Sequence, residues 1–297
     1  MMRFDEYCRR KEAAAVAAIL PAYRTIVSHG VDGLASVGNS WSRRLFDGPF
    51  YRSAAPAGEL PAMNLVFVQS REGNTGADDP SSLGGGETDK HLIYEGLSRV
   101  DVDAVLSGAA TARERELVFS VWHPELVALR RELGHGRHPV QVIITTSGQL
   151  PLDEGLMFAT PGLQVILLCV TPTADRLSRA VADRPWIEVI DAGAPHAFRG
   201  AMTKLRERGI RSISCVGGRT TATSLLRAGV VSDLYLTTSP LSAGEPHTPF
   251  YEGPPLSLTK IVEKAGQDRE AGVRFEHFVV RPPHGGPDAS MAGGPNA

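Results

Sequence analysis

The sequence predicts an α/β protein with a mixed, mostly parallel sheet and helices on both faces. Strand-forming runs such as 64–69, 139–146 and 163–170 alternate with helix-forming segments such as 87–99 and 198–209. This alternation is typical of parallel sheets whose strands are joined by helices. The 297 residues, 42% of them hydrophobic, suit one large domain with an additional segment.

Three regions follow from the distribution of these patterns. We expect an N-terminal helix and irregular arm, a main domain and a disordered Pro/Gly-rich tail, over residues 1–60, 61–281 and 282–297. The first helix is expected over 4–20, ending near Pro21. The arm is predicted to lie on the main domain or on a partner subunit; a partly disordered leader is an equally open alternative.

The rest of the arm carries no periodic pattern. Residues 24–38 are expected to continue as helix and then loop. Residues 39–61 are rich in Gly, Pro, Ser and aromatic residues and are expected to be irregular.

The main domain is expected to begin with a strand and a long loop. After the strand 64–69, residues 70–86 form a loop long enough to be functional or mobile. Further strands are expected at 103–107, 139–146, 163–170, 186–190, 210–216, 233–238 and 275–280. Helices are expected at 87–99, 123–134, 173–182, 198–209 and from 221 to Gly229.

Composition excludes several classes of function. The net charge of −2 argues against a nucleic-acid-binding protein, which usually has a basic excess. Three scattered cysteines indicate neither a disulfide framework nor a zinc site, so a reducing cytoplasm is expected. The Ala-rich N-terminal run resembles neither a signal peptide nor a membrane span. No metal-ligand motif is present, and no metal is expected.

The turn Gly217-Gly218-Arg219-Thr220 lies between a predicted strand and a predicted helix. Backbone N–H groups and the helix dipole at such a turn favour a phosphate group. A plain strand-to-helix turn that needs glycine for close packing is the alternative. Two further turns of small residues, 108–111 and 145–148, also follow predicted strands. In parallel sheets these turns lie at one edge, so the three are expected to converge on one dinucleotide.

Neither GxGxxG nor GxxxxGK[ST] occurs, so no standard dinucleotide fingerprint or P-loop is present. The order of segments nevertheless resembles a known family. Ser70-Arg-Glu-Gly73, then DAVLSGAAT at 103–111, and finally GGRTTATSLLRAGVVSDLYLTTSP at 217–240 resemble the reductase domain of riboflavin biosynthesis. This family has the dihydrofolate reductase fold, and the resemblance covers residues 60 to 281.

The resemblance implies NADPH as hydride donor, a homodimer, and reduction of the ribose of a phosphoribosylated diaminopyrimidine-type intermediate. It implies that residues from four segments bind the cofactor: Gln69, Ser70, Thr111, Ser147, Gly217, Gly218, Arg219, Thr220, Thr221 and Ala222.

On the substrate side the resemblance implies Arg99, Trp122 and Val216, of which Arg99 matches an arginine that holds the substrate's phosphate. The other positions depart from the family. Arg115-Glu116-Leu117 replaces Asp-Asp-Pro, Trp122 replaces an arginine, and Val216 replaces a glutamate. Core packing is an open alternative for Trp122, and helix-end neutralisation for Arg99. The catalytic group is not predicted.

The first hypothesis is therefore an NADPH-dependent reductase of a pyrimidine or pterin-like small molecule, with no nucleic-acid or membrane partner. The second is a non-catalytic relative that binds NADP in a regulatory or structural role. A third, weaker hypothesis assigns partner binding to the N-terminal arm.

Overall fold

A single ten-stranded sheet organises the molecule. The computed structural model describes residues 3–54, 58–194 and 197–281. The strand order is β1-β11-β12-β10-β4-β9-β5-β6-β7-β8, and β2 pairs with β3 in a separate hairpin. The tail predicted at 282–297 lies outside the described residues.

The strands from β10 to β8 are parallel to one another, as the sequence predicts. The sequences of β6 and β7 are rich in Val, Ile and Leu because helices cover both faces of this part of the sheet. The parallel strands are β4 (Ala62–Gln69), β5 (Ala104–Gly108), β6 (Val140–Thr145), β7 (Val165–Val170), β8 (Ile187–Gly193), β9 (Ser212–Cys215) and β10 (Asp233–Thr238).

The remaining strands extend the sheet in antiparallel fashion beyond β10. They are β12 (Arg274–Arg281), β11 (Ser257–Gly266) and β1 (Tyr23–Ser28). The strand β12 confirms the expected run at 275–280, whereas the sequence patterns did not indicate β11. In β11 apolar and polar residues do not alternate regularly. Two of its buried positions carry Lys264 and Gly266.

The N-terminal region is more regular than expected. The prediction of helix and then loop at 24–38 is wrong, because β1 and β2 (Leu34–Val37) form there. Residues 39–61 are not irregular throughout, since they contain α2 (Ser40–Leu45) and β3 (Phe50–Ser53). The signal for α2 is local: Asn39 and Ser42 form a reciprocal capping box. The β1 signal is weak because only one face of this edge strand is buried.

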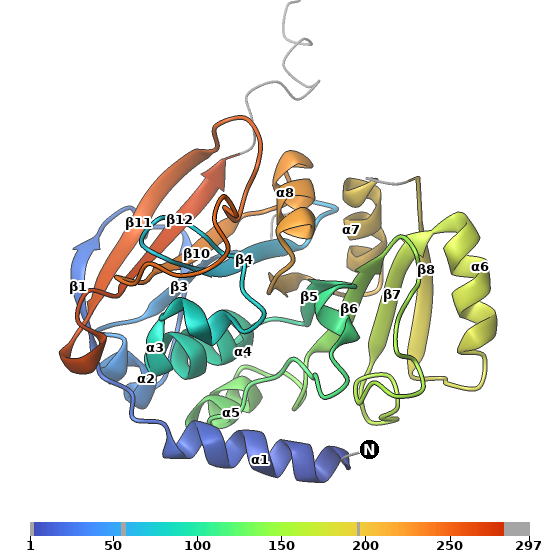
Figure 1. Ribbon diagram of the computed structural model, residues 1–297, viewed down its shortest axis with the longest axis horizontal. Helices are drawn as coiled ribbons and strands as arrows, with labels where there is room; N and C mark the ends of the chain where they lie inside the picture. Colours follow the sequence, from blue (N-terminus) through green and yellow to red (C-terminus); the bar gives the residue numbers. More distant parts are fainter. Residues whose placement is uncertain (1–2, 55–57, 195–196, 282–297) are drawn as a thin grey trace, which may run out of the picture.

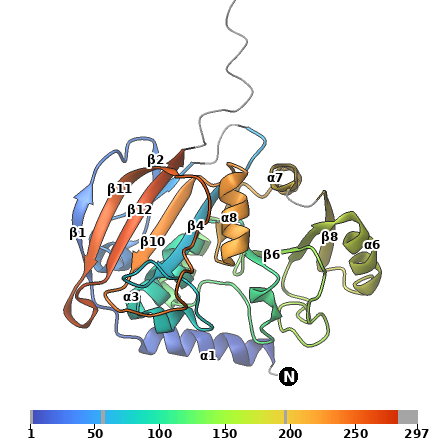
Figure 2. The same ribbon diagram turned by 45° about the horizontal axis from the view of Figure 1, so that its top comes forward.

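Two layers of helices cover the sheet (Figure 1). The helices α7 (Phe198–Glu207) and α8 (Arg219–Arg227) pack on one face around Met202, Leu205 and Leu225. The opposite face is covered by α1 (Phe4–Ala17), α6 (Thr171–Ala180), α5 (Pro124–Glu132) and the helical segment 86–100. Viewed from a second direction, α1 lies along the lower side of the molecule, far from α7 and α8 (Figure 2).

The helical segment 86–100 is not a regular α-helix. It consists of α3 (Gly86–Thr88), the π-helix η2 (Asp89–Leu97) and α4 (Ser98–Val100). The π-helix is rare, and the single-turn form that interrupts α-helices is frequently found at functional sites. Leu92, Ile93 and Leu97 face the core, as their spacing predicts.

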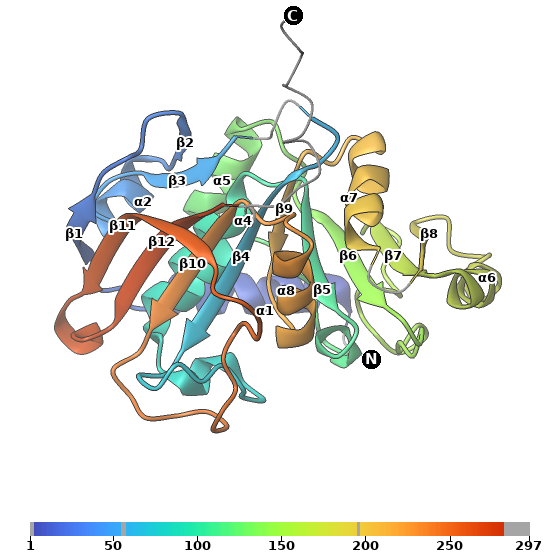
Figure 3. The same cartoon turned by 90° about the horizontal axis from the view of Figure 1, so that it is seen from above.

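The topology brings the ends of the parallel strands to two opposite edges of the sheet. Figure 3 shows β4 and β10 side by side and pointing the same way. Their carboxyl ends, together with those of β9, β5 and β6, form the edge at which ligands bind in parallel α/β sheets.

Candidate functional site

The turn after β9 leaves backbone N–H groups open at the start of α8. Gly217 and Gly218 have φ values of 142° and 83°, in the region where only glycine is unstrained. Gly218 is the N-cap of α8, and no side chain caps this helix end. The uncapped first turn at Arg219–Thr221 therefore presents free donors and the positive end of the helix dipole, which suits a phosphate group.

The turn after β5 lies directly against this turn. A methyl group added at Gly108 would lie 2.6 Å from Thr221 Oγ1, and one added at Gly218 would lie 4.0 Å from Gly108 Cα. Thr111, three residues after Gly108, begins a short 3-10 helix and is half-buried. The two turns predicted to share one ligand are thus neighbours at the same edge.

The turn after β6 continues the edge. Ala109 N–H donates to Ile144 O (2.9 Å), which ties the β5 turn to the end of β6. Gly148 N–H donates to Thr145 Oγ1 (2.8 Å), and Ser147 is exposed. Beside this turn lies an apolar hollow between the ends of β6, β7 and β8 and the start of α7, lined by Thr145, Thr146, Val170, Ala194, Ala197 and Phe198.

Gln69 and Ser70 end β4 at the same edge. Gln69 Nε2 donates to Thr238 Oγ1 (3.0 Å), and Ser70 Oγ donates to Glu72 Oε2 (3.1 Å). Ser70 is fully buried, and Ala222 is fully buried in the α8 core, so their side chains face the protein. Any contact that these two residues make with a cofactor has to use the backbone.

A buried acid near the end of β4 was missed by the sequence patterns. Asp89, on the first turn of η2, is 7% exposed and accepts a hydrogen bond of 2.5 Å from Thr237 Oγ1. Thr237 pairs with Val68, next to Gln69, so this acid lies just below the carboxyl edge of β4 and β10. A methyl group at Gly85 would lie 2.8 Å from Asp89 Oδ2.

The surroundings of Asp89 favour the neutral carboxyl group. Burial raises the pKa of Asp89 to about 7, the hydroxyl of Thr237 lowers it, and nearby Glu270 raises it. No described residue forms a salt bridge with Asp89. Burial also raises the pKa of Glu270. In the sequence, Asp89 is distinguished only by being an aspartate within the helix expected at 87–99, whose apolar residues are expected to face the core.

The three residues expected on the substrate side lie in the protein interior. Trp122 is 1% exposed and packs edge-on against Tyr7 of α1, with ring centroids 5.6 Å apart. Val216 belongs to the same apolar cluster. Arg99 is 2% exposed, stacks on Tyr94 at 4.2 Å, and donates to Ser120 O (3.3 Å).

Arg115 is exposed and paired with Glu154 at 2.6 Å. Arg99 does not lie at the carboxyl edge of the sheet, because the segment that carries it leads into the amino end of β5. Val216 lies at the carboxyl edge, since it directly precedes Gly217.

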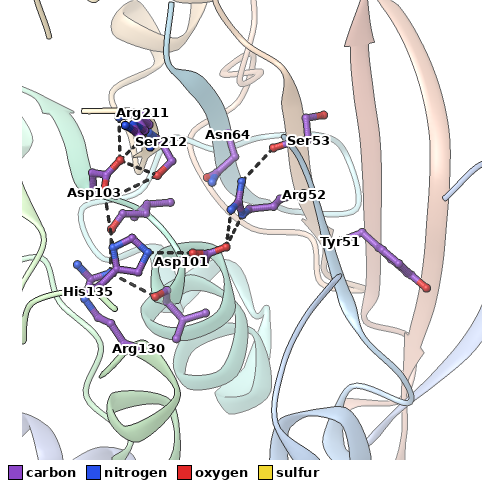
Figure 4. A network of polar contacts seen from close by, with 12 residues as sticks. Tyr51, Arg52, Ser53, Asn64, Asp101, Asp103, Arg130, His135, Arg211 and Ser212 are labelled. Atoms are coloured by element: carbon purple, nitrogen blue, oxygen red, sulfur yellow. Dashed lines mark hydrogen bonds and ion pairs between the residues drawn. The ribbon is translucent and has the colours of Figure 1, made fainter. Parts of the chain in front are cut away.

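A polar network occupies the opposite, amino-terminal edge (Figure 4). Asp101 accepts from Arg52 Nε (2.6 Å) and contacts His135 Nε2 (2.9 Å), and Asp103 accepts from the N–H of Arg211 (2.7 Å). Because each carboxylate is satisfied by local partners, this network joins the β2–β3 hairpin and α5 to the sheet. Among the described residues, no group of three or more His, Cys, Asp or Glu side chains can hold a metal ion.

Comparison with known proteins agrees with this architecture. The family model described as the RibD C-terminal domain matches residues 61–269. The comparison with curated proteins finds no match. None of the helices described is long and apolar enough to cross a membrane.

Solved structures share the fold at low sequence identity. A pyrimidine reductase-like protein from Corynebacterium diphtheriae is 21% identical, with a TM-score of 0.61 over 74% of this chain and 92% of that one. The riboflavin biosynthesis reductase of Saccharomyces cerevisiae is 15% identical, with a TM-score of 0.56 over 76% and 92%. A Thermotoga maritima diaminohydroxyphosphoribosylaminopyrimidine deaminase/5-amino-6-(5-phosphoribosylamino)uracil reductase is 18% identical, with a TM-score of 0.56 over 75% and 57%. This chain therefore spans little more than half of the Thermotoga protein.

Proposed function

Because the chain belongs to the RibD C-terminal domain family, we propose that it is an NADPH-dependent reductase of a pyrimidine or pterin-like small molecule. One observation carries the proposal: the turns after β9, β5 and β6 meet at one edge, and the turn after β9 opens onto an uncapped helix start. Three neighbouring backbone turns match the length of a dinucleotide. A single phosphate group would occupy only one of them.

The residues at this edge fit the parts of NADPH. The open first turn of α8 and the left-handed Gly217 and Gly218 accommodate the pyrophosphate, with Thr221 and Thr111 beside it. Ser147 and the apolar hollow next to it suit the adenosine part. Gln69 and Ser70 then border the nicotinamide end. When bound, NADPH supplies the hydride.

Reduction of a C=N or C=O group needs a proton as well as a hydride. We assign the proton source at this edge to Asp89, since its carboxyl group has a pKa of about 7 and is hydrogen-bonded to Thr237, which pairs with Val68 at the end of β4. A carboxyl group with a pKa near the working pH is suited to general acid catalysis.

The substrate is proposed by class. The 5-amino-6-(5-phosphoribosylamino)uracil named for the Thermotoga protein is one member of that class. A homodimer in the cytoplasm is part of the same proposal and follows from the family resemblance.

Titration with NADPH and with NADH, followed by protein fluorescence, tests the cofactor assignment. Saturable binding of NADPH that is weakened by Thr221→Ala is expected, with Ser224→Ala on the outer part of α8 as control. If neither nucleotide binds, the proposal is wrong. Absence of turnover of every pyrimidine and pterin tested, despite tight NADPH binding, would favour a non-catalytic NADP-binding relative, which the loss of charged residues at Trp122 and Val216 supports.

A further inference from the structure

Glu270 reaches from the turn between β11 and β12 to the start of the helical segment 86–100. It belongs to the 3-10 helix η4 (Asp268–Glu270), and it is 4% exposed. Its Oε1 accepts a hydrogen bond from the N–H of Thr88 at 3.0 Å, and Thr88 directly precedes Asp89. The turn between β11 and β12 therefore lies against α3 (Figure 1). Through this bond the antiparallel part of the sheet holds the turn that carries the assigned proton source.

Two glycines bring the carboxyl groups of Asp89 and Glu270 close to the same stretch of backbone. A methyl group added at Gly85 would lie 2.8 Å from Asp89 Oδ2. One added at Gly86 would lie 2.6 Å from Glu270 Oε1. Gly86 also has a φ of 87°, in the region where only glycine is unstrained. Consecutive residues of one turn are thus in contact with one acid each.

Tyr23 of β1 brings a third titratable group to the same place. It pairs with Gly266 of β11, and a methyl group added at Gly266 would lie 3.1 Å from Glu270 Cβ. The hydroxyl group of Thr88 donates to Pro21 O (2.9 Å), two residues before Tyr23. Three segments that are distant in the sequence therefore meet around the first turn of the helical segment.

Two buried atoms of this cluster have no hydrogen-bond partner among the described residues. They are Glu270 Oε2 and the hydroxyl oxygen of Tyr23, and both side chains are more than nine-tenths buried. None of the ion pairs between described residues includes Glu270 or Asp89. Glu270 is therefore a buried acid without a cation beside it, which is a costly arrangement that calls for an explanation.

The other titratable groups that face the two acids do not compensate their charge. These groups are Glu87, Tyr23 and Tyr94. The buried Lys264 of β11 donates instead to Thr25 Oγ1 (2.8 Å) and Asp47 O (2.9 Å). Burial raises the pKa of Asp89 to about 7, and the negative charge of Glu270 adds to that rise.

We propose that Glu270 is a positioning residue for Asp89: it anchors the turn that carries Asp89, and its uncompensated charge disfavours the ionised form of Asp89. This inference rests on the proposed function, because Asp89 is assigned there as the proton source. The anchoring bond and the charge are separable. A glutamine at position 270 keeps an oxygen that accepts from the N–H of Thr88, but it carries no charge.

The titration of Asp89 in the full chain, followed by carboxyl carbon NMR with isotope-labelled aspartate, tests the proposal. The Asp89 signal is the one that Asp89→Asn loses. Glu270→Gln is expected to lower the midpoint of this titration by at least about 0.5 pH unit, because it removes a like charge from the surroundings of Asp89.

Asp268→Asn is the matched control. It removes the same charge from an exposed position on the same turn, where a φ of 52° suits asparagine. The midpoint of Asp89 should not change. An unchanged midpoint in Glu270→Gln would reduce Glu270 to a structural acceptor for Thr88 and overturn the proposal. Equal shifts in Glu270→Gln and Asp268→Asn would overturn it as well, since net charge would then account for both.

Hydrogen exchange of the Thr88 amide measures the anchoring bond separately. Glu270→Leu removes the acceptor and should accelerate this exchange about tenfold, whereas Glu270→Gln should preserve the wild-type rate. Equal exchange rates in the two variants would contradict the anchoring role. If Glu270→Leu does not fold, the titration in Glu270→Gln still decides the proposal. Absence of NADPH binding would overturn the proposed function, and it is distinguishable because neither measurement on Asp89 or Thr88 requires the cofactor.

Discussion

The carboxyl group of Asp89 on η2 and the hydroxyl group of Thr237 on β10 are joined by a hydrogen bond of 2.5 Å in the protein interior. The bond links the start of the π-helix to the middle of the sheet. It is also the only hydrogen bond described for this carboxyl group, which has no cationic partner among the described residues. The protonation state of this carboxyl group therefore affects the free energy of unfolding.

Stability is expected to depend on pH through Asp89. Its pKa is about 7 in the folded protein and roughly 3.9 in the unfolded chain. Between these values the folded state binds more protons, so this contribution is fully present below pH 4 and is lost as the pH rises through 7. Asp89→Asn removes the effect. Its free energy of unfolding should exceed that of the wild type by about 2–4 kcal/mol at pH 8.

Urea unfolding at pH 4 and pH 8 measures this difference. At pH 4 the two proteins should differ by less than about 1 kcal/mol. Asp175→Asn, at an exposed position of α6, is the control and should be neutral at both pH values. An equal effect of Asp89→Asn at both pH values would show that Asp89 is already ionised when buried.

Gly108→Ala is expected to weaken NADPH binding about tenfold, at roughly 1.4 kcal/mol. The added methyl group would lie 2.6 Å from Thr221 Oγ1, so Thr221 must shift away from the turn that we assign to the pyrophosphate. Fluorescence titration gives the dissociation constant. Gly162→Ala is the control, since a methyl group there meets no atom within 4 Å. Unchanged affinity in Gly108→Ala would place the pyrophosphate elsewhere.

Arg130→Lys is expected to destabilise the protein by about 2–4 kcal/mol, although it keeps the charge. Arg130 Nη1 donates to the carbonyls of Arg99 (2.9 Å), Val100 (3.3 Å) and Val102 (2.8 Å), and a lysine cannot reproduce this fork. Denaturant unfolding should show the loss. Arg131→Lys on the exposed side of the same helix should change stability by less than about 0.5 kcal/mol. Equal effects of the two substitutions would contradict the role given to Arg130.

Sequence patterns captured the parallel half of the molecule because burial on both faces leaves an unambiguous signal. The runs of β6 and β7 and the glycine turn at 217–218 could be assigned from residue type alone. The strand β11 could not, since Lys264 is buried beneath Phe46 and breaks the apolar alternation. The arm was misjudged because β1 pairs with β11, far away in the sequence, and because Phe50 of β3 packs against the distant Tyr235 and Phe275.

Only part of the candidate site could be predicted from the sequence, for the same reason. Turns at strand ends are local features, so their convergence follows from topology. Asp89 depends on Thr237, about 150 positions away, and on the packing of a π-helix. Trp122 packs against Tyr7 of α1, and no spacing rule indicates which helix covers it.

The pairing of β1 with β11 has a consequence for the order in which the chain becomes structured. Tyr23 meets Gly266, and β4 is flanked by β9 and β10, both made long after it. During synthesis β4, the first strand of the parallel sheet, has no neighbouring strand on either side until residues 212–238 have been made. Such distant pairings carry a high loop-closure cost and slow folding. The early segments therefore spend this interval exposed, and protection from aggregation on the ribosome is most needed there.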